Sequence, residues 1–345
     1  MLEVIEKNQA LLTPISELLN KAGIAADIVS VDNYFTGRNN RTYRVDTTKG
    51  QFVIKQYLKQ EGDKRDRLNT EFSFLTYAQI AAPQFVAKAY CQDSQLGMAL
   101  YEFLDGHAIT LQELTKADVM QAAEFFCALN EVRVRAHGKT LPIASEACFS
   151  IQAHFALIES RLEQLRTIVS GSVEDQSATA IVQQLDNYWQ QLMAELMQTA
   201  NAFNLDLSAG LEESQRCISP SDFGFHNALK MKDGSIRFLD FEYAGWDDPA
   251  KMVGDFFSQL AVPIPAVYFD EFVQTIVTPF PQPEKLVQRA NFLRLVYRVK
   301  WCCIALNIFL PVHQARYQFA NKELDIVAFK QQQLEKVNNL LKEML

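Results

Sequence analysis

The sequence is poor in glycine and has no long apolar run. Only 13 of its 345 residues are glycine, and the phosphate-binding pattern GxxxxGK[ST] does not occur. The most apolar stretch, residues 301–312, contains Asn307 and is shorter than the roughly 20 residues that a membrane-spanning helix needs. The first residues, MLEVIEKNQALL, carry acids early and no basic flank before an apolar core, so we expect no secretory signal.

Cysteine and histidine lack the spacing of metal or redox sites. None of the six cysteines forms a CxxC pair, and the five histidines show no metal-ligand spacing. We therefore expect thiols packed as small apolar groups in a reducing, cytoplasmic compartment. With 33 basic and 41 acidic residues the net charge is −8, which argues against a general nucleic-acid binder. We expect no nucleic-acid or membrane partner, and the sequence leaves the oligomeric state open.

What is present is an ordinary globular composition, with 48% apolar and 21% charged residues. The length suggests two lobes, each with a sizeable core. In residues 1–104 the apolar pattern predicts a leading helix over 2–22, a second helix over 65–80, and strands at 28–35, 42–45, 51–58, 85–92 and 97–104. Because most of these strands follow one another directly, we expect a five-stranded antiparallel sheet with one main helix.

Residues 105–345 are predicted to be mostly helical. The helical patterns cover 114–134, 151–168, 175–202, 251–260, 268–277, 284–309 and 322–345. A short β-rich insert at 216–219, 228–231 and 236–241 interrupts them, with a small hairpin turning at 232–234. The expected fold class is therefore α+β, a sheet lobe followed by a helical lobe.

The most informative segment runs from residue 217 to residue 257. Asp222 and Asn227 lie five residues apart on a predicted loop, and Asp240 follows after the hairpin. A carboxylate and an amide carbonyl suit Mg²⁺, and a second carboxylate beside them can orient an attacking hydroxyl and take its proton. A bare D-x4-N arises easily by chance, and both residue types also make local turn bonds. Its weight depends on the rest of the chain.

Two groups upstream have the order that phosphoryl transfer needs. Lys55 ends an apolar run on the third predicted strand, and Glu71 follows sixteen residues later on a helix. A strand lysine paired with a helix glutamate can hold nucleotide phosphates. The loop 36–42, TGRNNRT, could place backbone N–H groups and Asn40 over the same phosphates. The alternatives are a strand lysine with its ammonium in water, an exposed helix acid and an ordinary turn asparagine.

On these residues the chain resembles the bacterial phosphotransferase family of aminoglycoside kinases, choline kinases and related small-molecule kinases. The resemblance extends from about residue 28 to the C-terminal helices and is strongest in SDFGFHNAL and IRFLDFEYAGWDDPAKMVGDF. It implies a bilobal, protein-kinase-like fold, with a nucleotide-binding lobe at 1–104 and a catalytic and acceptor-binding lobe at 105–345.

The resemblance also implies roles for individual residues. Asp222 would be the catalytic base, and Asn227 and Asp240 would bind Mg²⁺. Lys55 would contact the phosphates of ATP, with GTP as an open alternative, and Glu71 would orient it. The stretch 101–104 would be the interlobe hinge, where the backbone at Tyr101 and Phe103 can bond to the nucleotide base.

The chain departs from the family pattern in several places. The histidine that usually stands two residues before the catalytic aspartate is Pro220 here, which puts the geometry of the loop in doubt. A Leu-His pair that often ends the first long helix of the second lobe is Leu129–Asn130. The phosphate loop has only Gly37, and no Ala-Pro-Glu follows an activation loop, so a protein kinase is not expected.

The acceptor is less clearly indicated. Four residues just beyond Asp240 could line its site: Glu242, Tyr243, Trp246 and Asp247. Acids would suit an amino sugar and aromatic rings would suit choline. A basic stripe with Arg294, Arg298 and Lys300 could instead bind a sugar acid, although a solvated helix face is the simpler interpretation. Asp255 is expected to be a buried acid that braces the catalytic loop. His226 could contact phosphate or substrate, or it could be structural.

The predicted function is an enzyme, an ATP- and Mg²⁺-dependent kinase that phosphorylates a hydroxyl of a small sugar, amino sugar or amino alcohol. The alternative from another class is a nucleotide-binding pseudokinase that acts as a regulator or scaffold, which Pro220 invites. A helical interaction protein is a third possibility, which predicts no response to nucleotide.

Overall fold

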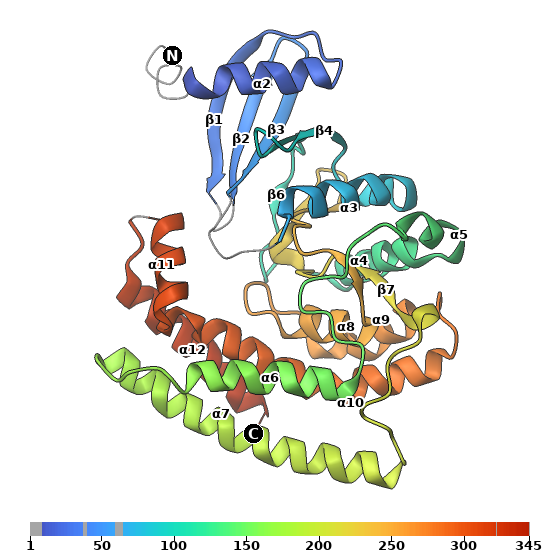
Figure 1. Cartoon of the computed structure of the whole chain (residues 1–345), viewed down its shortest axis with the longest axis vertical. Helices are drawn as coiled ribbons and strands as arrows, with labels where there is room; N and C mark the ends of the chain where they lie inside the picture. Colours follow the sequence, from blue (N-terminus) through green and yellow to red (C-terminus); the bar gives the residue numbers. More distant parts are fainter. Residues whose placement is uncertain (1–8, 37–39, 59–64, 322, 345) are drawn as a thin grey trace.

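A computed structural model of the chain describes residues 9–36, 40–58, 65–321 and 323–344. It shows a five-stranded antiparallel sheet at one end and a larger, mostly helical part at the other (Figure 1). The predicted α+β class, with a sheet lobe ahead of a helical lobe, is confirmed. Gly37 and residues 2–8 of the predicted leading helix lie outside the described residues.

The sheet has the strand order β1-β2-β3-β5-β4, and every neighbouring pair is antiparallel. Gly50 has a φ of +129°, a conformation that favours glycine, in the tight turn between β2 and β3. The elements of this part are α2 (Gln9–Lys21), β1 (Ile28–Thr36), β2 (Asn40–Thr47), β3 (Gly50–Tyr57), α3 (Arg67–Ala81), β4 (Ala89–Asp93) and β5 (Met98–Glu102).

The two faces of the sheet belong to two different cores. On β5, Met98 and Leu100 join the core that α2 covers, whereas Ala99 and Tyr101 join the core that contains α3. This alternation follows from the period of two along a strand. The α2 core is small and self-contained, while the α3 core continues through the whole helical part. Helix α3 therefore ties the sheet to the rest of the molecule.

The helical part is built around α10, which packs against α6, α8 and α12. In Figure 1, α6 and α7 lie at the end of the molecule farthest from the sheet. The helices are α4 (Lys116–Asn130), α5 (Val132–Arg135), α6 (Ile151–Leu165), α7 (Val173–Ala202), α8 (Pro249–Ser258), α9 (Phe269–Ile276), α10 (Pro283–Leu306), α11 (Pro311–Ala320) and α12 (Ile326–Met344).

Two small sheets lie between the five-stranded sheet and the helices. In one, β6 (His107–Ala108) pairs with the hairpin of β8 (Ala228–Lys230) and β9 (Ile236–Phe238). In the other, β7 (Cys217–Ser219) pairs with β10 (Gly245–Asp247). Residues 220–227 and 239–244 connect these strands, so both connections are held at their ends by β-pairing.

Several boundaries differ from the prediction. The helix expected over 114–134 is interrupted at Glu131, whose ψ of 132° is extended. The helix expected over 322–345 is α12, and α11 before it was not predicted. Strands β6 and β10 were also missed, because pairs and triplets of residues that pair with a distant strand carry no local periodicity.

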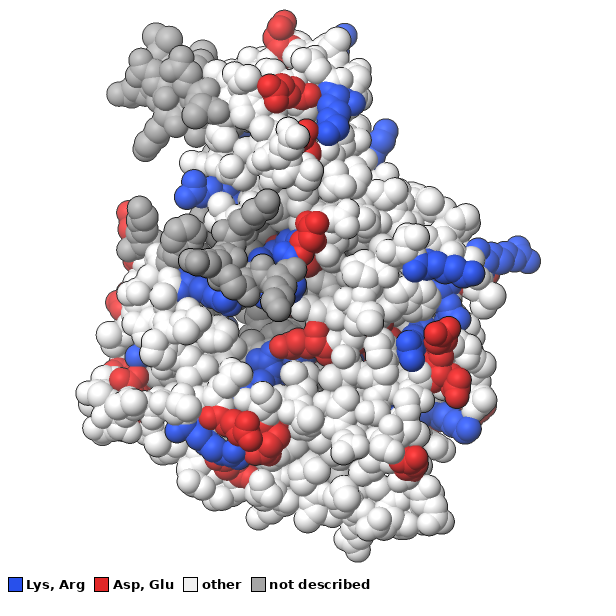
Figure 2. All heavy atoms as spheres, viewed as in Figure 1, with Lys and Arg blue, Asp and Glu red and all other residues white. Residues whose placement is uncertain are grey.

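Three surface and packing features complete the description. No single helix among the described residues is long and apolar enough to cross a membrane, although one bent pair, Pro283–Phe309 with Pro311–Gln318 at 73°, reaches that length and composition. All six cysteines are free thiols, and five of them are buried. On the face shown in Figure 2, basic and acidic side chains are interspersed and neither sign forms a broad patch.

Candidate active site

Lys55 lies at the centre of a buried ion-pair cluster. Its Nζ is 2.6 Å from Glu71 Oε2 on α3 and 2.6 Å from Asp240 Oδ1 beyond β9. Burial opposes the charge on Lys55, but the carboxylates of Asp240 and Glu71 outweigh it and raise its pKa well above the ordinary value. The lysine is therefore a fixed positive charge between the sheet and the connection that follows β9.

Two tyrosines extend this cluster into the sheet. The Tyr57 hydroxyl donates to Glu71 Oε2 at 2.7 Å, so the Tyr101 hydroxyl, 2.8 Å away, donates to Tyr57. Burial raises the pKa of both phenols well above their usual range. Glu71 thus accepts from both Lys55 and Tyr57, which fixes its orientation. Tyr101 contributes its side chain to this network.

The loop between β7 and β8 is anchored by aromatic side chains. Phe223 and Phe225 are buried, and their rings pack against Phe238 and Phe256. Between and beyond these anchors, Asp222, His226 and Asn227 remain partly exposed. Pro220 is buried directly before the loop. The loop therefore presents polar groups on a framework that is fixed in the large core.

Asp222 and Asn227 are brought together within this loop. Asn227 Nδ2 donates to the backbone oxygen of Asp222 at 2.9 Å, and His226 Nε2 lies 3.2 Å from Asp222 Oδ1. Partial burial favours the neutral carboxyl, but the hydrogen bond from His226 outweighs it, so the pKa of Asp222 lies below its ordinary value. Asp222 is therefore a carboxylate at neutral pH, able to accept a proton.

Asp240 is held beside the same loop. The Leu239 N–H donates to the backbone oxygen of Asn227 at 2.8 Å, and Asp240 itself has a φ of +63°. A left-handed aspartate is uncommon and costs free energy, so the surrounding structure must hold it. Its side chain is 37% exposed. Asp240 therefore contacts Lys55 and also remains partly open to solvent.

The donor set of Asn227 and Asp240 fits a small hard cation. Because the amide nitrogen of Asn227 is used on the loop backbone, its Oδ1 is the group left for a ligand, and Asp240 adds a carboxylate. Mg²⁺ takes few protein ligands and completes its shell with phosphate and water. The described residues contain no group of three His, Cys, Asp or Glu side chains that could hold a metal by themselves.

Asn40 and Glu242 meet on the inner side of the site. Asn40 Nδ2 donates to Glu242 Oε2 at 3.3 Å, and Arg67 Nε lies 3.6 Å from Glu242 Oε1. Both Asn40 and Glu242 are buried. Glu242 therefore links β2 to α3 through Arg67, and it does not present a free carboxylate to a ligand.

The other residues weighed for the acceptor also have partners inside the protein. Arg65 and Arg67 lie over the ring of Tyr243, and Trp246 Nε1 donates to Gly138 O at 3.0 Å. Asp247 is fully buried and 2.9 Å from Lys251 Nζ. Tyr243 and Trp246 are partly exposed, whereas Glu242 and Asp247 are not.

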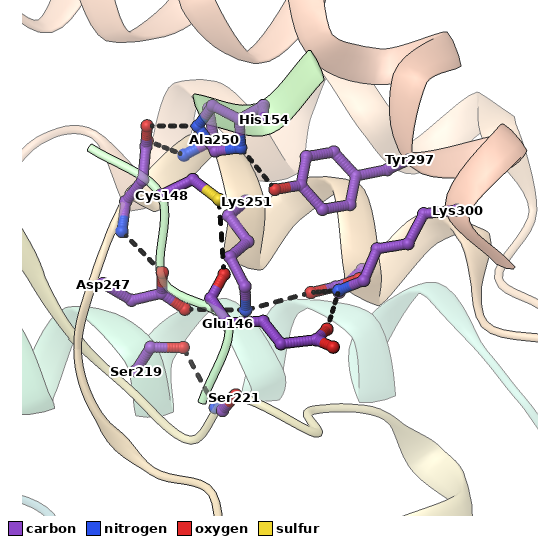
Figure 3. A network of polar contacts seen from close by, with 12 residues as sticks. Glu146, Cys148, His154, Ser219, Ser221, Asp247, Ala250, Lys251, Tyr297 and Lys300 are labelled. Atoms are coloured by element: carbon purple, nitrogen blue, oxygen red, sulfur yellow. Dashed lines mark hydrogen bonds and ion pairs between the residues drawn. The ribbon is translucent and has the colours of Figure 1, made fainter. Parts of the chain in front are cut away.

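Figure 3 shows that Asp247 belongs to a buried chain of alternating charges. Lys251 Nζ lies between Asp247 at 2.9 Å and Asp255 at 3.2 Å. Lys300 Nζ is 2.8 Å from Asp255 and 3.5 Å from Glu146. Lys300 is therefore an internal counter-ion of Asp255 and does not extend a solvent-facing basic stripe with Arg294 and Arg298.

The connection between β5 and β6 contains Phe103, which the sequence predicts to lie in the interlobe hinge. Phe103 lies between Tyr34, at 5.8 Å between ring centroids, and the Arg44 guanidinium, at 5.0 Å. In the described part of the chain, no backbone hydrogen bond engages residues 103–105.

Asn130 was seen in the sequence only as a departure from a family pattern. It is fully buried, its Nδ2 donates to Ile218 O at 3.0 Å, and its Oδ1 accepts from Ile218 N at 2.8 Å. The amide thus satisfies both backbone groups of a β7 residue just ahead of the loop that carries Asp222. No local signal could reveal this role, because its partner lies 88 residues away.

A model of the phosphotransferase enzyme family matches residues 35–275, which is more than half of the chain. The chain belongs to this family. Its membership makes the protein a small-molecule phosphotransferase with the protein-kinase-like fold. Among proteins of curated function, none matches the sequence.

Several solved structures share the fold of this phosphotransferase. A choline kinase from Cryptosporidium parvum is 11% identical, with a TM-score of 0.59 over 98% of this chain and 96% of that one. The choline kinase LicA from Streptococcus pneumoniae is 14% identical, with a TM-score of 0.56 over 97% and 99%. A spectinomycin phosphotransferase, solved with ADP and spectinomycin, is 13% identical, with a TM-score of 0.58 over 96% and 98%.

Proposed function

We propose that this phosphotransferase is a kinase that uses ATP and Mg²⁺ to phosphorylate a hydroxyl of a small metabolite. The observation that carries the proposal is the convergence of Lys55, Glu71 and Asp240 in one ion-pair cluster, next to the loop that presents Asp222. These four residues come from β3, α3 and two separate connections of the helical part. Their meeting supplies the parts that phosphoryl transfer needs.

Asp222 would act on the acceptor. Its carboxylate accepts the proton of the attacking hydroxyl as the new bond from oxygen to the γ-phosphorus forms and the bond to the β,γ-bridging oxygen breaks, which releases ADP. The lowered pKa of Asp222 keeps it ionised before the reaction. Its place on a loop anchored by Phe223 and Phe225 limits the freedom of the carboxylate, which supports precise positioning.

Lys55 would bind the α- and β-phosphates, with Glu71 holding it in place. In this structure the Lys55 ammonium also contacts Asp240 and neutralises the charge of that carboxylate. Asn227 and Asp240 would hold Mg²⁺, which neutralises charge on the phosphates when bound. With Mg²⁺ supplying the positive charge at Asp240, Lys55 would turn toward the phosphates.

The nucleotide base would lie against Phe103, with its edge bonded to the backbone at 103–105. Both ATP and GTP present hydrogen-bonding edges to such a hinge, and ATP is the proposed donor. We keep the division into a nucleotide-binding lobe at 1–104 and a catalytic, acceptor-binding lobe at 105–345. The connection beside Phe103, which follows β5, supports a boundary there.

The acceptor class is a sugar, amino sugar or amino alcohol. Tyr243 and Trp246 remain candidate lining residues because they are partly exposed beyond Asp240. The buried, paired state of Glu242 and Asp247 gives little support to a broad acidic pocket built from them. The structural relatives include a choline kinase and a spectinomycin phosphotransferase, so choline and spectinomycin are the first alcohols to try.

The competing function is a nucleotide-binding pseudokinase. Pro220 favours it, but Asp222 remains partly exposed and ionised on an anchored loop, and a binding protein has no chemical need for such a base. Turnover separates the two functions.

The test begins with thermal stability in ATP or GTP, each with and without Mg²⁺. A ligand at about 100 times its Kd should stabilise the protein by roughly 2.7 kcal/mol. ADP release is then measured with a panel of sugars, amino sugars and amino alcohols, for the wild type and for Asp222→Asn. We expect Mg²⁺-dependent stabilisation in both proteins and turnover only in the wild type. Stabilisation without turnover on any acceptor would favour the pseudokinase, and equal turnover in Asp222→Asn would refute the assigned base.

A further inference from the structure

We infer that His226 is a positioning residue that orients the Asp222 carboxylate for the reaction. The inference rests on the proposed function and adds a residue to its machinery. His226 Nε2 lies 3.2 Å from Asp222 Oδ1, four residues earlier on the same loop. Because an ionised carboxylate can only accept, the histidine donates its Nε2–H.

The polar contacts of His226 distinguish it from a structural histidine. Its buried Nδ1 has no hydrogen-bond partner among the described residues, so Asp222 is the single polar partner of the ring there. His154 shows the contrast: Nδ1 is 2.6 Å from Tyr297 Oη and Nε2 is 3.0 Å from Asp248 Oδ2, so its ring joins α6 to α8 and α10. His226 instead bonds only within its own loop, to Asp222, the proposed base.

Gly224 provides the space that this contact requires. A Cβ at residue 224 would lie 2.8 Å from His226 Nδ1 and 2.9 Å from His226 Cε1, well inside van der Waals contact. It would also meet Gln259 Cγ at 3.3 Å, so the added atom has little room on that side either. Any side chain at 224 therefore displaces the imidazole from Asp222. Gly224 and His226 are therefore both needed for the contact with Asp222.

The contact between His226 and Asp222, for which Gly224 leaves room, explains how the Asp222 carboxylate is held while it stays partly exposed. Phe223 and Phe225 fix the loop backbone, and Asn227 fixes the Asp222 carbonyl. None of these contacts restrains the rotation of the Asp222 side chain. The hydrogen bond from His226 to Asp222 Oδ1 does restrain this rotation.

The experiment compares His226→Leu, His226→Gln, Gly224→Ala and the double variant Gly224→Ala/His226→Leu. The assay is Mg²⁺-dependent ADP release from ATP, with the best acceptor of the panel or with water alone. A hydrogen bond to a charged group predicts a loss in kcat of about 10- to 100-fold for His226→Leu, with the KM for ATP changed less than about twofold. His226→Gln can place its Nε2–H near Asp222 and should recover part of the loss.

Gly224→Ala should lose activity to a similar extent, because it displaces the same ring. In the His226→Leu background it should cost much less than it does alone, since the contact is already lost. Stabilisation by ATP and Mg²⁺ is measured for each variant and reports whether it is folded.

The outcomes separate this inference from the proposed function. Absence of ADP release in the wild type counts against the kinase, and the inference fails with it. An active wild type with a folded His226→Leu variant of unchanged kcat overturns the inference alone. Equal losses in His226→Leu and His226→Gln, with a raised KM for ATP, would indicate a general packing role and would also overturn it.

Discussion

At the scale of single residues, Asn130 supports the strand that leads into the loop carrying Asp222. Its amide bonds both backbone groups of Ile218, two residues ahead of Pro220. Asn130→Ala would leave a buried N–H and a buried C=O without partners, so we expect a loss of about 2–4 kcal/mol in the free energy of unfolding. Urea denaturation measures it. Asn187→Ala on the exposed face of α7 is the control and should change little.

The cations at the site also allow a residue-scale prediction. On the proposed function, Lys55 would bind the phosphates directly, whereas Asp240 would act on them through Mg²⁺. We therefore expect Asp240→Ala to lose the Mg²⁺-dependent part of the thermal stabilisation by ATP and to keep the part seen without Mg²⁺. Lys55→Ala should lose both parts. If the two variants respond alike to Mg²⁺, the assigned division between lysine and metal site is wrong.

What the sequence could predict at this scale was the chemistry and not the contacts. Lys55, Glu71, Asp222, Asn227 and Asp240 suggested a phosphotransferase, because their types suit phosphoryl transfer and their order along the chain resembles the pattern of that family. The burial of Glu242 against Arg67 and of Lys300 against Asp255 could not be predicted, because each depends on a partner distant along the chain. Exposed and buried acids look the same in a sequence.

At the scale of elements, the contact between α8 and α10 depends on a glycine. A Cβ at Gly254 would lie 2.3 Å from Tyr297 Cγ and 2.7 Å from Tyr297 Cβ. Overpacking of this kind costs typically about 1–3 kcal/mol or more, so Gly254→Ala should lower the unfolding free energy by at least that much. Gly210→Ala, which would meet nothing within 4 Å, is the matched control. A stable Gly254→Ala variant would show that the helices can separate at small cost.

The start of α8 adds a pH-dependent contribution to stability. Asp248 caps the helix through Ala250 N at 2.7 Å and pairs with Arg289 Nε at 2.6 Å. Burial opposes its charge, but Arg289 and His154 outweigh it and lower the pKa of Asp248 to about 2. Because the folded-state pKa lies below the unfolded value, this stabilisation is present above about pH 4 and is lost as the pH falls toward 2.

Asp248→Asn tests this contribution, since the amide oxygen can still cap α8. A shift from 3.8 to about 2 corresponds to about 2 kcal/mol, which the variant should lack at pH 7. Its unfolding free energy should also fall less steeply than that of the wild type between pH 4 and pH 2. Burial raises the pKa of Asp247 to about 6, so that residue titrates above this window. Parallel acid unfolding curves for the two proteins would contradict the prediction.

The elements themselves were predictable where they carry their own periodicity. The five strands of the first sheet and the long helices follow from alternation and from helical spacing. The interruption of the helix at Glu131 and the two-residue strand β6 were not, because tertiary contacts decide them. Strand β10 likewise exists only because β7 lies beside it.

At the scale of the whole molecule, the two faces of the sheet pack into different cores. Only the face that packs against the large core is joined to the helical part. The core between α2 and the sheet contains Ile15, Leu18 and Leu19 and shares no residue with the large core. The other face of the sheet, with Tyr57 and Tyr101, belongs to the large core through α3. The boundary in packing therefore runs through the sheet, whereas the boundary in sequence that we propose follows residue 104.

This arrangement predicts local loss of stability when the small core is damaged. Leu18→Ala should cost about 2–5 kcal/mol within the α2 core, because it leaves a cavity there. Amide hydrogen exchange should then become faster in α2 and in the strands that face it, and should stay unchanged in α8 and α10. Leu293→Ala in α10, buried in the large core, is the control and should have the reverse pattern.

ATP with Mg²⁺ should slow the exchange of β3 in Leu18→Ala, because the ligand would bridge Lys55 on that strand to Asn227 and Asp240 in the helical part. If Leu18→Ala speeds exchange equally in all helices, the two cores unfold as one unit and the proposed division of the chain does not describe its energetics.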